Sequence, residues 1–116
     1  MSLKTFLSLS HVLVSPEGDR HGLVDQALAP LGKVRRLGLT VPQMFAVPAI
    51  VARTHMTATV MKRFALASQA ADDLVLFPPP LALPEIGFHL TWHRRNDASP
   101  AQAWLRGLIE STAALA

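Results

Sequence analysis

The stretch that most constrains the fold is residues 39–60, which read LTVPQMFAVPAIVARTHMTATV. A β-branched run passes directly into Pro42, a helix-like segment follows, and a second Thr/Val run comes next with no loop between them. Proline suits the first turn of a helix because its φ is already fixed and its missing N–H would have no partner there. The stretch therefore predicts a strand, a helix over 42–53 and a second strand in close succession.

The remainder of the chain shows the same alternation. Strand-like runs lie at 11–15, 34–41, 56–60 and 74–77. Helix-like segments lie at 20–31, 42–53 and 62–71. Strands separated by helices of about ten residues are typical of βαβ units. The sequence therefore predicts an α/β fold with a mainly parallel sheet and helices on both faces, in which ligands bind beyond the carboxyl ends of the strands.

Local signals predict where two helices begin. Asp19 is the expected N-cap of the helix over 20–31, because its side chain can accept a hydrogen bond from a free backbone N–H. Ser99 is the expected N-cap of a final helix over 100–115, with Pro100 at the first helical position.

The segment before the final helix is predicted to be extended. Three consecutive prolines end the run at 74–77 and make residues 78–84 irregular, because proline has no N–H for a sheet ladder. A further strand is predicted from Ile86 to Trp92, where apolar residues alternate with others.

Composition indicates the class of protein. At 116 residues with 50% hydrophobic content, the chain is predicted to be one domain with a real core. Charged residues make up only 16%, against roughly 25% in an average soluble domain, which favours some apolar surface that contacts a partner. The longest apolar run, Phe45 to Ala52, is too short to span a bilayer, so no membrane association is expected.

Charge and cysteine content argue against DNA contacts, disulfides and thiolate metal sites. The formal net charge is +3, but the arginine pairs Arg35-Arg36 and Arg94-Arg95 are isolated and are not interleaved with stacking aromatics. Nucleic-acid binding needs a basic face, so no direct DNA contact is expected from this chain. The absence of cysteine excludes disulfides and thiolate metal sites, which fits a cytoplasmic protein.

Histidines and carboxylates give no catalytic pattern. No histidine pair has the i, i+4 helical spacing of a zinc site, and His89 and His93 lie on an extended run that separates them too far to share a metal. Asp72 and Asp73 flank a predicted strand start, where solvated carboxylates are typical. Neither a Gly-rich phosphate loop nor a G-x-S-x-G motif is present. No metal, cofactor or catalytic residue is predicted; the alternative is a small α/β enzyme that uses Ser15 or a histidine at the strand ends.

Three blocks of sequence carry a family resemblance. They are HVLVSPEGD from residue 11, GLVDQALAPLGKVRRLGLTVPQMFAVPAIVARTHMTATV over 22–60, and LFPPPLALPEIGFHLTWHRRNDASPAQAWLRGLIES over 76–111. Their order and spacing resemble the effector-binding domain of LysR-type transcriptional regulators, especially the branch that includes nodulation-type regulators. Two positions depart from the family pattern, because His55 and Met61 stand where relatives commonly have an aspartate and a proline.

The resemblance implies a fold and an organisation. Such regulators have a two-lobed domain like a periplasmic binding protein (type 2), which holds a small effector between its lobes and dimerises. They bind DNA through an N-terminal winged helix that is not expected within residues 1–116. The chain is expected to be one truncated effector-binding domain, in which 12–88 form the second lobe. Residues 89–116 would be the return strand and C-terminal helix of the first lobe.

The resemblance also implies an effector site. Six residues match the cleft-facing strand-to-helix turn of relatives, namely Thr40, Val41, Pro42, Gln43, Met44 and Phe45. Free N–H groups at a helix start favour a carboxylate, and many family effectors are small acids or aromatics. The alternative is an ordinary turn with Phe45 in the core. Ser15 is a further candidate at the lobe crossover, although a plain turn residue before Pro16 would look the same.

The final helix is expected to form an interface. Its apolar stripe includes Trp104, Leu105, Leu108 and Ile109. By resemblance this helix packs on a first-lobe sheet that these residues largely lack, so a symmetric homodimer is expected to bury the stripe. The alternatives are that the helix folds back on the second lobe, or that the truncated chain keeps no effector function.

Overall fold

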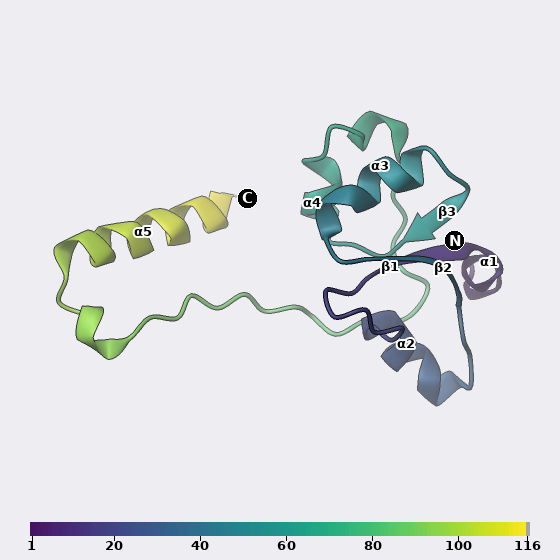
Figure 1. Cartoon of the computed structure of the whole chain (residues 1–116), viewed down its shortest axis with the longest axis horizontal. Helices are drawn as coiled ribbons and strands as arrows, with labels where there is room; N and C mark the ends of the chain where they lie inside the picture. The colour runs from purple at the N-terminus through teal and green to yellow at the C-terminus, as the bar shows by residue number, and fades with distance from the viewer. Residues whose placement is uncertain (116) are drawn as a thin grey trace. The chain divides into compact units, whose positions relative to one another are not determined.

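The structure is a computed structural model that describes residues 1–115 (Figure 1). The described chain forms two compact units, Met1–Pro84 and the residues from Glu85 onward. The first unit contains the sheet and the second contains the long C-terminal helix. No helix among these residues is both long enough and apolar enough to cross a membrane.

A three-stranded parallel sheet organises the first unit. Strand β1 (Ser10–Val14) lies in the middle, with β2 (Arg36–Val41) on one side and β3 (Met56–Ala58) on the other. The middle strand of a parallel sheet is covered on both faces, and His11, Val12 and Leu13 of β1 are accordingly all buried. The strands predicted near 11–15, 34–41 and 56–60 are therefore confirmed, with slightly different ends.

Short helices connect and cover these strands. They are α1 (Leu3–Ser8), α2 (Leu23–Leu28), α3 (Val47–Ala52) and α4 (Lys62–Leu66). Three single-turn 3-10 helices accompany them, at Ala29–Leu31, Met44–Ala46 and Ala71–Asp73. Helix α1 was not predicted, although Ser2 gives it an N-cap by accepting the Thr5 N–H at 3.1 Å.

Two apolar clusters show that helices cover both faces of the sheet. One cluster brings α1 and α2 together and contains Phe6, Val24 and Leu28. The other joins β1 and β2 to α3 and contains Val12, Val41 and Val47. Successive residues of a strand point to opposite faces, so His11 contacts Phe6 while Val12 packs toward α3. The predicted α/β class is confirmed.

His11 is a fully buried polar side chain in the middle strand. Its Nε2 lies 2.8 Å from the carbonyl oxygen of Phe6, and its ring packs edge-on against the Phe6 ring. Burial lowers the pKa of His11 by more than the Phe6 hydrogen bond raises it; of the nearby charges, Arg35 lowers it and Asp25 raises it. His11 is therefore a neutral structural residue that donates to Phe6.

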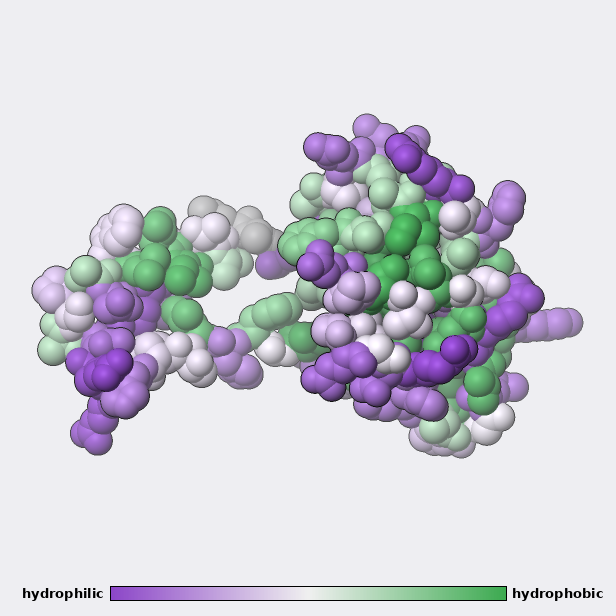
Figure 2. All heavy atoms as spheres, viewed as in Figure 1, coloured by the Kyte–Doolittle hydropathy of each residue, from purple (hydrophilic) through white to green (hydrophobic). Residues whose placement is uncertain are grey.

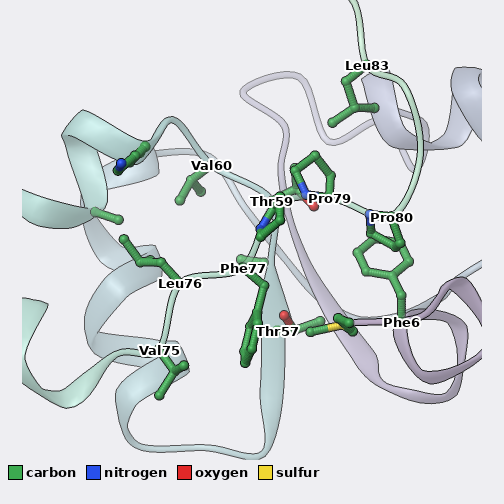
Figure 3. A pocket seen from close by; sticks show the side chains of 15 residues that line it. Phe6, Thr57, Thr59, Val60, Val75, Leu76, Phe77, Pro79, Pro80 and Leu83 are labelled. Carbon is green, nitrogen blue, oxygen red and sulfur yellow. The ribbon is translucent and has the colours of Figure 1, made fainter.

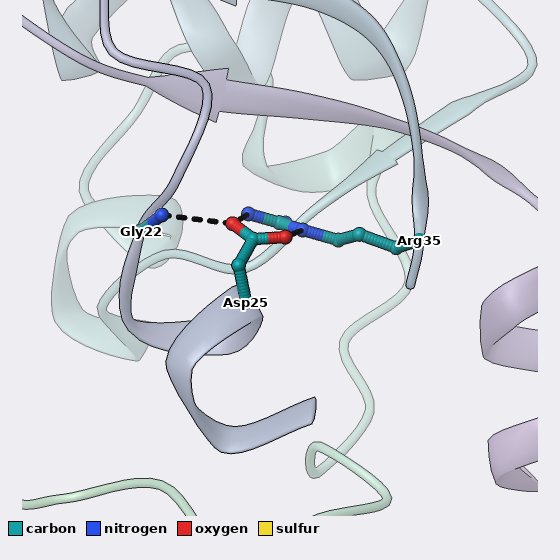
Figure 4. Close-up of polar contacts among 3 residues, drawn as sticks. All are labelled: Gly22, Asp25 and Arg35. Carbon is teal, nitrogen blue, oxygen red and sulfur yellow. Dashed lines mark hydrogen bonds and ion pairs between the residues drawn. The ribbon is translucent and has the colours of Figure 1, made fainter. Parts of the chain in front are cut away.

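A buried ion pair ties α2 to the start of β2 (Figure 4). The Nε and Nη2 atoms of Arg35 donate to the two carboxylate oxygens of Asp25 at 2.9 and 2.7 Å, and the Gly22 N–H donates to the same group at 2.8 Å. Burial alone would raise the pKa of Asp25, but the Arg35 and Gly22 hydrogen bonds hold it below its ordinary value. A Cβ at Gly22 would lie 3.0 Å from Leu13 Cδ1, so glycine allows α2 to begin close to β1.

Two predicted helix starts are wrong. Helix α2 begins after Gly22 rather than after Asp19, and its own first-turn residue Asp25 accepts the Gly22 N–H. Pro42 lies outside the helix that follows it, because α3 starts at Val47 and Pro48 occupies its first turn. In both places a second residue of the same type lies further along the chain, Asp25 for Asp19 and Pro48 for Pro42. The helix begins at this second residue's turn, where it packs against the sheet.

Two predicted strands, at 74–77 and from Ile86 to Trp92, are also wrong. Both segments are irregular in the structure, and no described strand pairs with either. A run of alternating or apolar residues becomes a strand only where a neighbour completes its hydrogen bonds, and the prolines at 78–80 cannot donate any. The expected irregularity of 78–84 is confirmed.

The second unit is a long helix with an anchored turn before it. Helix α5 (Pro100–Leu115) starts with Pro100 at its first position, as predicted. The Trp92 indole N–H donates to the Asp97 carboxylate, and the Arg106 guanidinium lies 4.5 Å from the centre of the Trp92 ring. Arg106 also donates to the Asp97 carbonyl at 3.2 Å, so one arginine holds the turn against α5.

The buried His11 predicts that the first unit loses stability in mild acid. Because its pKa is lower folded than unfolded, the unfolded state binds the extra proton, so the free energy of unfolding falls as pH drops below the unfolded pKa of about 6.5. Asp25 adds to this loss only at lower pH, as its own depressed pKa is approached. Urea unfolding of the chain between about pH 5 and pH 7 measures the slope.

Two variants test whether His11 causes this pH dependence of the free energy of unfolding. His11→Phe keeps a buried ring beside Phe6 and removes the titrating group, so its unfolding free energy is expected to change little between about pH 5 and pH 7. Val34→Phe, which adds the same ring at a position that is 86% exposed and removes no titrating group, is the control and should keep the slope of the parent chain. An unchanged slope in His11→Phe would contradict this account of His11.

Candidate functional site

The carboxyl ends of the three parallel strands meet at one edge of the sheet, where ligands of such sheets bind. Ser15 directly follows β1, Thr40 and Val41 end β2, and Thr59 follows β3. The Ser15 N–H donates to the Val41 carbonyl at 2.8 Å, which extends the ladder between β1 and β2 by one bond. The structure thus brings the predicted Ser15 and the predicted turn together.

The predicted turn itself is a bent connection with an accessible outer side. Val41 is buried, and Thr40 and Met44 are half-buried. Pro42, Gln43 and Phe45 are exposed. The turn therefore combines a fixed inner end with side chains that remain free to contact a ligand.

Phe45 does not enter the core, so the alternative that placed it there is wrong. Its side chain is 79% exposed, and its ring lies against Phe64 of α4 with centroids 5.3 Å apart. The two rings border a groove of about 560 Å³ between α3 and α4, which Arg53 and Asp73 also line. Of the predicted effector residues, only Phe45 lines this groove.

A second cavity, also of about 560 Å³, lies at the edge of β3 (Figure 3). Its walls come from α1, from β3 and the residues after it, and from the irregular segment 75–83. Phe6, Pro79 and Pro80 lie toward one end, Val75 and Leu76 lie toward the other, and Phe77 lies between them beside Thr57 (Figure 3).

Sequence reasoning missed this cavity. None of its lining residues was among the predicted effector residues. The available signal was that MTATV, like the two other strands, ends at the ligand-binding edge of the sheet. The wall formed by Phe6 could not be anticipated, because α1 itself was not predicted.

Titratable groups in the described residues do not form a metal centre. No cluster of three or more histidine, aspartate or glutamate side chains occurs within residues 1–115. His11 is enclosed by protein and bonded to Phe6, while His89 and His93 are exposed. The adjacent Asp72 and Asp73 lie exposed in a 3-10 turn rather than at a strand start.

The residues predicted for an interface are accessible on α5. Trp104 is 69% exposed, and the other three, Leu105, Leu108 and Ile109, are each more than two-fifths exposed. In the space-filling view, green hydrophobic residues appear on the surface of the second unit among purple polar ones (Figure 2). This apolar stripe has no covering partner within the described residues of its own unit.

Comparison with known proteins identifies the family. Residues 1–114 match the family described as the LysR substrate binding domain. The chain belongs to this family. The resemblance found in the three sequence blocks is therefore confirmed, and so is the α/β fold expected of a periplasmic-binding-protein-like domain.

Similar proteins include two transcriptional activators. The chain is 40% identical to the HTH-type transcriptional activator NagR of Ralstonia sp and 37% identical to the HTH-type transcriptional activator NahR of Pseudomonas putida. Each match covers 109 residues and 94% of this LysR-family chain. The chain spans only 36% of the length of each activator.

A solved structure shares the fold. The regulatory domain of MexT, a transcriptional activator in Pseudomonas aeruginosa, superposes with a TM-score of 0.74 at 32% sequence identity. The match covers 94% of this chain and 55% of the MexT chain. The LysR-family fold is thus supported by the family match and by the likeness to a solved structure.

The exposed position of Phe45 predicts a small effect on stability. Phe45→Ala removes one aromatic pair and little buried area, so the free energy of unfolding is expected to fall by about 0.5–1.5 kcal/mol. Val47→Ala, two residues along and 1% exposed, is the comparison and should cost more, because it opens the core beside Val12. Urea unfolding of both variants measures the difference, and a larger loss in Phe45→Ala would show that its ring is part of the core.

Proposed function

We propose that this chain is the effector-sensing and dimerising part of a LysR-type transcriptional regulator. The observation that carries the proposal is the family match over residues 1–114, together with activator relatives at 37–40% identity. In this proposal the chain binds a small acidic or aromatic molecule and performs no chemistry on it. The regulator acts in the cytoplasm, and DNA is bound by a winged helix that residues 1–116 do not contain.

The proposed effector site consists of Ser15 and the turn residues Thr40, Val41, Pro42, Gln43, Met44 and Phe45. Its support is the position of these residues at adjacent strand ends, joined by the hydrogen bond from Ser15 to Val41. The Thr40 hydroxyl and the backbone N–H groups at the start of the 3-10 turn are the donors we assign to a carboxylate. The exposed Phe45 ring would contact the apolar part of the ligand.

The proposed organisation follows the two lobes of the family. Residues 12–88 would be the second lobe, and 89–116 would be the part of the chain that returns to the first lobe. The change from one compact unit to the next at Pro84 and Glu85 supports a boundary in this region.

The hydrogen bonds of the histidines in residues 1–115 are structural ones, which is consistent with a binding function. In the described residues, two histidines form hydrogen bonds through a ring nitrogen. His11 bonds to the Phe6 carbonyl and His93 accepts the Arg95 N–H, so neither bonds to a serine or threonine hydroxyl. A nucleophile needs a base within hydrogen-bond reach. The proposal that this chain is not an enzyme rests on its relatives, which are transcriptional activators.

A benzoate titration tests the effector site. On addition of benzoate to the chain, the amide resonances of residues 40–45 are expected to shift. Thr40→Val, which keeps the shape and removes the hydroxyl, should weaken binding by about tenfold, because a hydrogen bond to a charged group contributes about 1.5–3 kcal/mol. Isothermal calorimetry or the shift titration measures the affinity.

The control carries the same substitution elsewhere. Thr112→Val removes an exposed hydroxyl on α5 that donates to the Leu108 carbonyl, and benzoate affinity should not change. Benzoate shifts confined to remote arginines, or equal affinity in Thr40→Val and the parent chain, would remove the turn from the proposed site.

The second part of the proposal is a symmetric homodimer formed through α5. Exposure of four large apolar side chains in one stripe costs several kcal/mol, at about 25 cal/mol for each Å² of apolar surface left in water. A second copy can cover the stripe because the same surface on each chain is self-complementary in a two-fold interface.

Sedimentation of charge variants tests the dimer. The parent chain at micromolar concentration should sediment at about twice its chain mass of 12.6 kDa. Leu108→Glu places a charge in the stripe and should give a monomer. Ala103→Glu, on the opposite side of the same helix, should remain dimeric, and equal masses for the two variants would contradict an interface through the stripe.

A further inference from the structure

The outer edge of β3 borders the cavity described above. β1 pairs with one side of β3, and no described strand pairs with the other. Thr57, Ala58, Thr59 and Val60 line the cavity along this free edge. Across from them the irregular segment 75–80 passes by without forming a ladder (Figure 3).

We propose that this cavity is a binding site for a small neutral molecule with a flat apolar ring. It is distinct from the effector turn, because neither Ser15 nor any of residues 40–45 lines it. The proposal stands on the size, the composition and the charge of the lining, and does not depend on binding at the turn.

Size and composition fit a ring-containing ligand. A volume of about 560 Å³ lies within the usual range of small-molecule pockets, roughly 300–1,000 Å³. The walls are formed mainly by apolar side chains, with buried Phe6 and Ala65 as fixed contacts and Phe77 as a more exposed one. An apolar cavity holds water poorly and favours an apolar occupant.

The polar groups of the lining select against a cation. Lys62 is the only charged side chain among the lining residues, and it is exposed, so its ammonium group can remain in water. No carboxylate of residues 1–115 lines the cavity, so a positively charged ligand would lose its hydration there without a counter-ion.

Neutral hydrogen-bonding groups are available at the strand edge. Thr57 and Thr59, which both carry a hydroxyl, line the cavity, and an unpaired strand edge offers backbone N–H and C=O groups. A ligand with one hydroxyl or amide beside its ring can satisfy one of these groups while burying the ring. The polar part of the ligand would therefore lie against β3 and the ring against Phe77 and the prolines.

Titration of the whole chain with N-phenyl-1-naphthylamine tests the site. This neutral probe becomes fluorescent in apolar surroundings, and a saturable one-to-one rise is expected. Thr59→Phe fills the cavity and should weaken binding by about tenfold or more. Val34→Phe adds the same ring at a position that is 86% exposed and outside the lining, so affinity should remain that of the parent chain.

A second variant tests the same site in case circular dichroism shows that Thr59→Phe is unfolded. Phe77→Ala removes a wall of the cavity at a half-exposed position and should weaken the probe several-fold. The proposal is overturned if the probe does not saturate, or if neither variant changes its affinity.

Two further measurements test the ligand class and the competing occupant. 1-Naphthalenemethanol should displace the probe, whereas the matched cation 1-naphthylmethylammonium should not, and equal displacement would overturn the assignment of a neutral ligand. Hydrogen exchange reports on the chain itself. If the amides of residues 75–77 are strongly protected without ligand, this segment occupies the edge of β3 and the proposed site does not exist.

Discussion

The first unit depends on one buried ion pair. The Arg35 side chain is almost completely enclosed, and a buried guanidinium is tolerated only when its charge and its donors are matched. Asp25 matches it through two hydrogen bonds and takes the Gly22 N–H as well. The start of α2 is thereby fixed to the residue that precedes β2. β2 then runs beside β1, with a register shift between His11 and Val12, and the ladder ends at the hydrogen bond from Ser15 to Val41, in the proposed effector site.

Much of this arrangement could be predicted from the sequence, for reasons visible in individual residues. The strands β1, β2 and β3 are short β-branched runs with turn residues beyond them, and their order with intervening helices leaves a parallel sheet as the simple solution. The wrong assignments share one cause. Asp19 and Pro42 have the right chemistry for a helix start, but Asp25 and Pro48 have it too, and long-range packing decides between them. The run at 74–77 lacks a pairing neighbour, which no local pattern reveals.

One part of the candidate site could be predicted from the sequence and another part could not. Ser15 and residues 40–45 could be placed at one sheet edge because parallel strands end together, and the structure does bring them side by side. The cavity beside β3 could not be predicted, because its walls combine α1 with β3, α4 and segment 75–83 from a distant part of the sequence. The cavity exists because segment 75–77 does not pair with β3. If Val75, Leu76 and Phe77 formed a strand beside β3, they would fill the space that they now border.

Shape decides what each apolar surface can bind. The cavity beside β3 is concave and surrounds a volume of small-molecule size, so a compact ring gains contacts on several sides there, whereas a protein surface could insert only a single side chain. The stripe of Trp104 and its neighbours on α5 lies on a convex helix, which touches a small molecule on one side only. Burying such a stripe needs an extended complementary surface, which another helix supplies by ridge-and-groove packing. The two shapes therefore support the two different partners proposed for these surfaces, a small ligand for the cavity and a second copy of the chain for the stripe on α5.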